Sequence, residues 1–123
     1  MPGRQSTALL KSTALGTLLQ LIMIVLGHFA PTIAGLYAGG GMAISGVTGL
    51  LYSIWGGKES LGGAALGGAA AGGISAFLGI MASHLMGDVP VALLSVGAAA
   101  SAVTGAIGGM VGRVVSNPSG IAH

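Results

Sequence analysis

Two histidines and one aspartate are the side chains of this sequence best suited to chemistry at a membrane surface. His28 and His84 each lie at the end of a long apolar run, and Asp88 follows His84 by one helical turn. Imidazole can be an axial ligand of haem or of a chlorophyll-type pigment, and it can act as a proton-sensitive gate. The plainer interpretation is that both histidines face water or lipid headgroups and bind nothing. We rank that interpretation first, haem or pigment second and a metal third, because two neutral imidazoles alone bind a metal weakly.

The remaining residues offer little for catalysis. Glu59 and Asp88 are the only carboxylates, and the topology derived below places them on opposite faces of the membrane, where they cannot act as an acid–base pair. The segment 56–59 has the Gly-Gly-Lys of a phosphate-binding loop, but Glu follows where such a loop needs Ser or Thr. We therefore predict that the protein is not an enzyme.

One strongly polar residue, Gln20, interrupts the first apolar run near its middle. An amide at that depth in a bilayer should find a hydrogen-bonding partner across a helix interface. We favour this interpretation, and a pore-lining amide is the alternative.

The composition indicates a membrane protein. Of the 123 residues, 53% are hydrophobic and 5% are charged, and the mean hydropathy is +0.94. Soluble domains carry roughly 25% charged residues, so the composition argues strongly against a soluble fold. A net charge of +2 is too small for nucleic-acid binding, which needs a basic face. The absence of cysteine excludes disulfides and thiolate metal sites.

The apolar runs predict an all-α integral membrane protein, a single domain over residues 1–123 with four transmembrane helices. The spans are expected at about 12–29, 32–55, 61–86 and 91–112, each long enough to cross a bilayer. The first run is not expected to be a cleaved signal peptide, because His-Phe-Ala at 28–30 is a poor cleavage site. Tyr52 and Trp55 at the end of the second span suggest a membrane interface.

The basic residues predict the orientation. With four spans, all of them fall on the side that also holds both termini: Arg4, Lys11, Lys58 and Arg113. Because Lys and Arg concentrate in cytoplasmic loops, both termini should be cytoplasmic, in a membrane of the bacterial inner-membrane type.

Small residues recur at helical spacing along the last three spans, and the stretch 62–79 is the richest in them. In lipid such rows let helix backbones approach closely. We predict helix packing at Gly35, Gly39, Gly41, Ser45, Gly49, Gly63, Gly67, Gly68, Gly72, Gly97, Ser101, Gly105 and Gly109.

A shift of 56 residues aligns the first half of the chain with the second. Ser-Gly-Val-Thr-Gly at 45–49 then matches Ser-Ala-Val-Thr-Gly at 101–105, and His28 matches His84. This indicates two tandem helical hairpins. Because both halves start on the cytoplasmic side, they would be related by a parallel pseudo-twofold axis along the membrane normal.

Length and span number are similar to those of the small multidrug exporters and the dual-topology fluoride channels. The exporters' membrane glutamate and the channels' Phe and Thr motif are absent here. The glycine-rich pattern with Gly-Lys-Glu-Ser at 57–60 is similar to the protein-import translocases of the mitochondrial inner membrane, whose Arg and Asp motif is also missing. We assign no family.

These observations predict a non-enzymatic membrane protein whose glycine-rich faces serve assembly, as a homo-oligomer or as an accessory subunit of a larger membrane complex. The spans contain few polar groups, and ion and proton paths usually need them. A homo-oligomeric channel or small transporter is the first alternative. A subunit that binds haem or a pigment through its histidines is the second.

Overall fold

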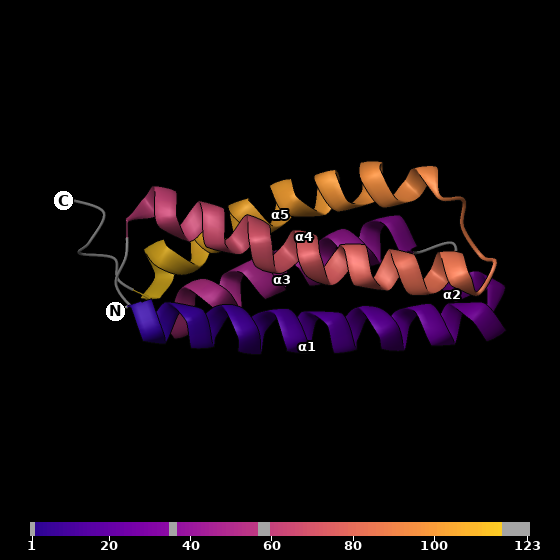
Figure 1. Ribbon diagram of the computed structural model, residues 1–123, viewed down its shortest axis with the longest axis horizontal. Helices are drawn as coiled ribbons and strands as arrows, with labels where there is room; N and C mark the ends of the chain where they lie inside the picture. The colour runs from indigo at the N-terminus through magenta and orange to yellow at the C-terminus, as the bar shows by residue number, and fades with distance from the viewer. Residues whose placement is uncertain (1, 35–36, 57–59, 117–123) are drawn as a thin grey trace.

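The computed structural model describes residues 2–34, 37–56 and 60–116, and these residues form helices and no strand. Four long helices, α1 (Pro2–Phe29), α3 (Tyr37–Gly56), α4 (Leu61–Leu85) and α5 (Ala92–Ser116), form an antiparallel bundle. The single-turn helix α2 (Pro31–Ala34) lies between α1 and α3. In Figure 1, α1 begins and α5 ends at the same end of the bundle. The predicted all-α fold is confirmed.

Three of the helices are long and apolar enough to cross a membrane: Gln5–Phe29, Leu61–Leu85 and Ala92–Ser116. Their outward surfaces carry large aliphatic side chains such as Leu18, Leu66 and Val103, which are more than half exposed. A soluble protein rarely exposes so continuous an apolar surface. These findings support the prediction of a membrane protein. Helix α3 has 20 residues and is rich in glycine, which contributes little hydrophobicity.

The helices differ in extent from the predicted spans. Helix α1 already begins at Pro2, so the residues before the first expected span, which was placed at about 12–29, are also helical. The second predicted span is divided into α2 and α3, and residues 35–36 between them lie outside the described ranges, as does the tail after Ser116. A helix and a membrane span need not have the same bounds, because a helix can continue into the headgroup layer or into water.

Local turn chemistry fixes both ends of α4. The Ser60 side chain caps its first turn and accepts a hydrogen bond of 3.0 Å from the Gly63 amide. At the other end, Gly87 has φ +82°, a left-handed conformation that glycine adopts without steric cost. The amide of Gly87 donates to His84 O (2.9 Å) and that of Asp88 to Ser83 O (3.0 Å). This is a Schellman ending, which stops the helix and turns the chain toward α5.

The centre of the bundle is a contact between helix backbones. A Cβ atom placed on Gly105 of α5 would overlap the Gly68 carbonyl of α4, and one placed on Gly49 of α3 would overlap the Gly105 carbonyl. A Cβ atom on Gly72 would lie 2.9 Å from the Gly105 Cα atom and 3.0 Å from the Ser45 carbonyl oxygen. Only glycine allows three backbones to meet this closely, and close approach gains dispersion and weak Cα–H···O contacts.

The other predicted packing residues have varied surroundings. Gly109 lies against the Ala64 carbonyl, and Gly67 lies under the Tyr52 ring. Gly39 is exposed and has no neighbouring atom within 4 Å of its Cβ position, whereas Gly35 lies outside the described residues. Gly63 belongs to the capped turn of α4.

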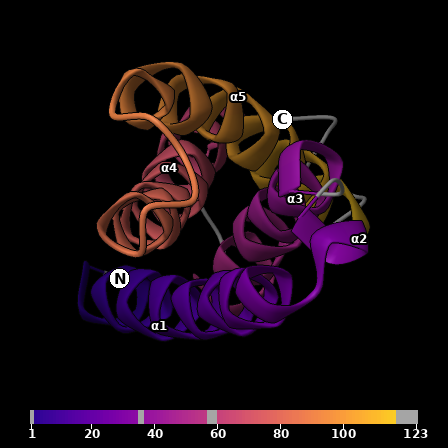
Figure 2. The same ribbon diagram turned by 90° about the vertical axis from the view of Figure 1, so that its right-hand side faces the viewer.

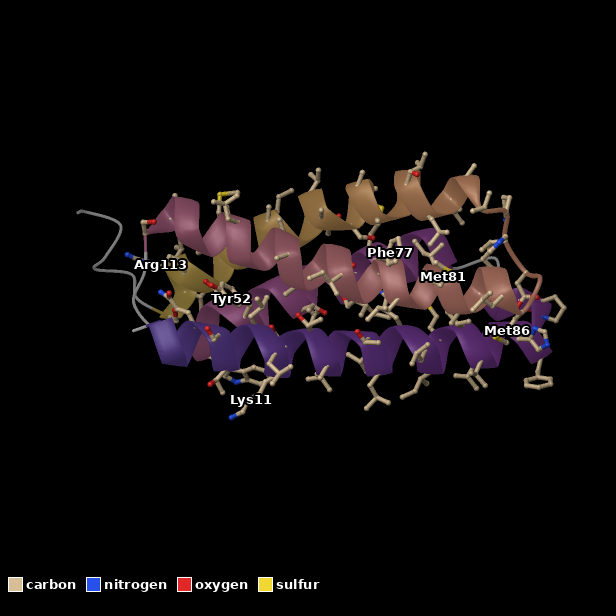
Figure 3. All side chains as sticks on the ribbon, viewed as in Figure 1. Lys11, Tyr52, Phe77, Met81, Met86 and Arg113 are labelled. Atoms are coloured by element: carbon tan, nitrogen blue, oxygen red, sulfur yellow. The ribbon has the colours of Figure 1, made fainter. Side chains whose placement is uncertain are left out.

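Tyr52, which was expected near a membrane interface, is buried between the helices and does not lie on the outer surface of the bundle. It is 5% exposed, and its ring fills the space left by the missing side chain of Gly67. Figure 3 shows it between the helices near the end where α1 begins. Trp55, by contrast, is 38% exposed.

The repeat is matched by the helix bounds but not by the packing. Shifting the chain by 56 residues places α4 on residues 5–29 of α1 and α5 on α3. A parallel twofold axis would also require α1 to contact α5 as α3 contacts α4. Between the described residues, α3 packs on α4, and α1 and α5 have no comparable contact. The twofold repeat therefore stays a prediction.

Candidate functional site

Both histidines contact the turn between α4 and α5, His28 from α1 and His84 from the end of α4. His28 Nδ1 lies 2.8 Å from Asp88 Oδ2, and His84 Nδ1 donates to the Val89 carbonyl oxygen at 2.9 Å. Asp88 thus pairs with His28 of α1 rather than with His84, which it follows in sequence. The left-handed Gly87 explains this, because it ends the helical path before Asp88.

These contacts give the histidines a structural role. Each uses its Nδ1 atom within the protein, and His28 and Asp88 keep 34% and 26% of their side-chain surface exposed. No three His, Cys, Asp or Glu residues of the described ranges lie close enough together to hold a metal ion. Binding of haem or a pigment stays a prediction, and the arrangement adds no observation in its favour.

Gln20 lies at the centre of a polar crossing between three helices. Its side chain is 3% exposed. The Nε2 atom donates to the Gly41 carbonyl oxygen (3.1 Å) and to Ser45 Oγ (3.3 Å), both on α3. Ser45 Oγ in turn donates to the Gly72 carbonyl oxygen of α4 at 3.2 Å. The Gln20 amide therefore forms hydrogen bonds across a helix interface, as we favoured for a polar side chain in the middle of the first apolar run.

Gly79 of α4 has no side chain and so leaves room for Gln20 of α1. A Cβ atom on Gly79 would lie 2.8 Å from the Gln20 Cβ atom, so any larger residue would push α1 away. Another serine, Ser75, also donates to the Gly72 carbonyl oxygen, at 3.0 Å. The result is a buried, hydrogen-bonded layer of Gln20, Ser45, Gly72 and Ser75.

A cavity of about 220 Å³ lies between this polar layer and the turn that joins α4 to α5. All four long helices contribute to its wall, and Val89 of the turn also lines it. Figure 2 views the bundle from the end with this turn and shows how α1, α3, α5 and α4 are placed relative to one another. The wall is mainly apolar and consists of Gln20, Met23, Ile24, Gly41, Met42, Ala76, Ile80, Ser83, Val89, Leu93, Val96, Gly97, Ala100 and Ser101.

The cavity lies toward the end where α4 and α5 diverge (Figure 1). At the central contact, glycine backbones of α3, α4 and α5 touch each other. Toward the turn, a side chain lies between α4 and α5. The Ile80 side chain of α4 reaches Gly97 of α5 and would overlap a Cβ atom placed there. Side chains hold helices further apart than glycines do. The helices thus separate from the central contact toward the turn.

No protein family, curated protein or solved structure matches this chain. The function must therefore be inferred from the bundle, its polar layer and its cavity.

Ser83 is the residue of this region that sequence reasoning missed. It is 1% exposed, it lines the cavity, and its hydroxyl has no hydrogen-bonding partner among the described residues. In a helix a serine hydroxyl commonly bonds to a carbonyl of its own preceding turn, as Ser75 does here. Nothing in the sequence separates Ser83 from the serines that only pack.

A second missed group is a row of glycines that holds α5 against α3. Cβ atoms on Gly108 and Gly112 of α5 would meet the carbonyl oxygens of Gly46 and Leu50 on α3. Gly108 and Gly112 are four residues apart, and this spacing could have indicated a second packing face. They lie beside the row that contains Gly105 and Gly109.

Proposed function

We propose that the protein is a non-enzymatic integral membrane protein with four spans, α1, α3, α4 and α5, and with both termini in the cytoplasm. Three of these helices have the length and composition of membrane spans, and α3 lies alongside them in the same bundle (Figure 1). Lys11 and Arg113 lie toward the end where α1 begins and α5 ends (Figure 3). Basic residues of membrane proteins concentrate on the cytoplasmic side, which supports this orientation in a membrane of the bacterial inner-membrane type.

Reporter fusions test the topology. A reporter fused after Ser60 should be active as a cytoplasmic protein, and one fused after Asp88 should be active only as an exported protein, because α4 separates the two sites. A fusion after Ser116 should match the one after Ser60. Equal signals from the Ser60 and Asp88 fusions would contradict both the four-span topology and the repeat.

Within the membrane, we propose that the chain acts as a compact structural module, either a homo-oligomer or an accessory subunit of a larger complex. The observation that carries this proposal is the central contact of Gly49, Gly68 and Gly105, which packs α3, α4 and α5 into one tight unit. Because these glycines are used inside the bundle, association with other chains must use the outer surface. Gly39 is a candidate there, since no atom of its own chain lies within 4 Å of its Cβ position.

Purification in a mild detergent tests the structural role. We expect a protein mass above the 11.7 kDa of one chain, as a multiple of the chain or with co-purifying subunits. Gly39→Leu should reduce this association without changing the stability of the single bundle, because the new side chain projects away from it. A monomer that shows no crosslinking to itself or to other proteins in native membranes would contradict the proposal.

A channel or small transporter is the second candidate, and the cavity is the observation that favours it. The cavity reaches as far as the polar layer, where Gln20 forms part of its wall. Beyond that layer the backbones of α4 and α5 touch at Gly68 and Gly105. A path through one chain would therefore require these helices to separate, and flux into proteoliposomes would distinguish this candidate from the structural module.

A further inference from the structure

We propose that the cavity between the four long helices binds a small, uncharged, one-ring molecule that carries a hydroxyl group. The proposal goes beyond the structural role and does not depend on whether the protein associates with other chains. It rests on the size of the cavity, the chemistry of its wall and one unpaired hydroxyl.

The volume of the cavity fits a single ring with a short substituent. It measures about 220 Å³, and an apolar protein cavity of roughly 150 Å³ is known to bind benzene. The backbone contacts of the central glycines prevent the cavity from extending toward the other end of the bundle.

The wall selects an uncharged molecule. Lys, Arg, Asp, Glu and His are all absent from the lining residues, and an unpaired ion in such surroundings would lose its hydration without compensation. Two methionines, Met23 on α1 and Met42 on α3, are among the lining residues. Thioether side chains adapt to irregular shapes and make favourable contacts with aromatic rings, so an aromatic ring suits this wall better than an aliphatic one.

We assign the recognition of the ligand's hydroxyl group to the Ser83 side chain. Ser83 is one of the lining residues. Its hydroxyl is buried and has no partner among the described residues, and a buried hydroxyl without a hydrogen bond is costly. The Ser83 hydroxyl can donate to the oxygen of a bound phenol-type molecule. Gln20 lies on the same wall, nearer the bundle centre, and its Nε2 hydrogens are committed to Gly41 and Ser45. Its Oε1 atom is an acceptor, which a bound hydroxyl could approach from the cavity.

A lipid acyl chain is the competing occupant, since the cavity lies in the membrane-spanning part of the bundle. An acyl chain would fill the apolar space, but it would leave the Ser83 hydroxyl unpaired. The two occupants therefore differ in whether Ser83 contributes to binding, and this difference decides the test.

The test measures binding of 4-fluorophenol to the full chain in lipid nanodiscs by ¹⁹F NMR, with protein-free nanodiscs to correct for partitioning into lipid. The apolar probe 4-fluorotoluene has the same shape without the hydroxyl. We expect 4-fluorophenol to bind the unaltered protein more tightly than 4-fluorotoluene. Ser83→Ala should weaken 4-fluorophenol about tenfold and leave 4-fluorotoluene unchanged, since one hydrogen bond contributes about a tenfold change in affinity. Folding should not suffer, because the substitution removes an unpaired polar group.

Two further variants test whether a change in probe binding comes from the cavity itself or from a general change in the protein. Ser53 also has a buried hydroxyl without a partner but does not line the cavity, so Ser53→Ala should bind both probes like the unaltered protein. Gly41→Leu should exclude both probes, because the Cβ position of Gly41 has room, with its nearest neighbour at 3.5 Å, and the longer side chain would enter the cavity. The proposal is overturned if Ser83→Ala binds 4-fluorophenol as tightly as the unaltered protein does. It is also overturned if neither probe binds above the nanodisc blank, or if the cavity retains a phospholipid that Gly41→Leu releases and 4-fluorophenol cannot displace.

Discussion

Replacing Gly105 with leucine should disrupt the packing of the whole bundle. The Cβ position of Gly105 overlaps the Gly68 carbonyl and lies 3.1 Å from the Gly72 Cα atom, so the obstacle is backbone, which cannot move aside as a flexible side chain can. Overpacking a dense core typically costs about 1–3 kcal/mol where side chains can adjust. Because α4 would have to leave α5, we expect Gly105→Leu to lose at least about 3 kcal/mol. Unfolding in mixed micelles with increasing dodecyl sulfate measures the change.

The matched control is a glycine with open space around it. Gly62 lies in the first turn of α4, is exposed, and has no atom within 4 Å of its Cβ position. Gly62→Leu should therefore leave the unfolding midpoint nearly unchanged. Gly105→Ala should fall between the two variants, since a single methyl group already overlaps the Gly68 carbonyl. Equal stability of Gly105→Leu and Gly62→Leu would show that the close contact of α4 and α5 does not hold the bundle together.

The features that could be predicted from the sequence are those that depend on spacing within one helix. The row of Gly97, Ser101, Gly105 and Gly109 marks one face of α5 whatever the helix packs against. Two of its members, Gly105 and Gly109, lie against backbone atoms of α4. The hydrogen bonds of Gln20 across α3 follow from a similar local argument, because an amide in a membrane span has few other partners.

The features that could not be predicted depend on how helices are placed relative to each other. The pairing of Asp88 with His28 requires the left-handed turn at Gly87, and helical periodicity alone suggested His84 as the neighbour. The burial of Tyr52 depends on which residue of α4 lies opposite it. The cavity depends on how α4 and α5 are placed near the turn, where Ile80 of α4 reaches Gly97 of α5. None of these relations is encoded in a spacing that can be read along one segment.

The polar layer leads to the second prediction of a large effect, for the substitution Gln20→Glu. Glutamate has nearly the same shape as glutamine, but a carboxylate cannot donate to the Gly41 carbonyl oxygen or to Ser45 Oγ, which the Gln20 amide contacts at 3.1 and 3.3 Å. It would instead place a negative charge beside these oxygens in the middle of a membrane span. We expect a loss of about 2–4 kcal/mol at pH 8. Gln20→Leu introduces no charge and leaves Ser45 bonded to Gly72, so it should lose only about 1 kcal/mol.

The loss in Gln20→Glu should depend on pH in a defined direction. Burial among carbonyl oxygens favours the neutral form of the new acid over the carboxylate. In that case the destabilisation is smallest below the unfolded-state pKa of about 4.3 and grows as the pH rises above it. Unfolding midpoints relative to the unaltered protein at pH 4 and pH 8 measure this difference.

The other glutamine, Gln5, provides the control: it lies in the first turns of α1 and is only partly buried, so Gln5→Glu should show little change at either pH. A Gln20→Glu variant as stable as Gln5→Glu at pH 8 would mean that the Gln20 site admits water or ions. The polar layer would then be part of a hydrated path, as the channel alternative requires.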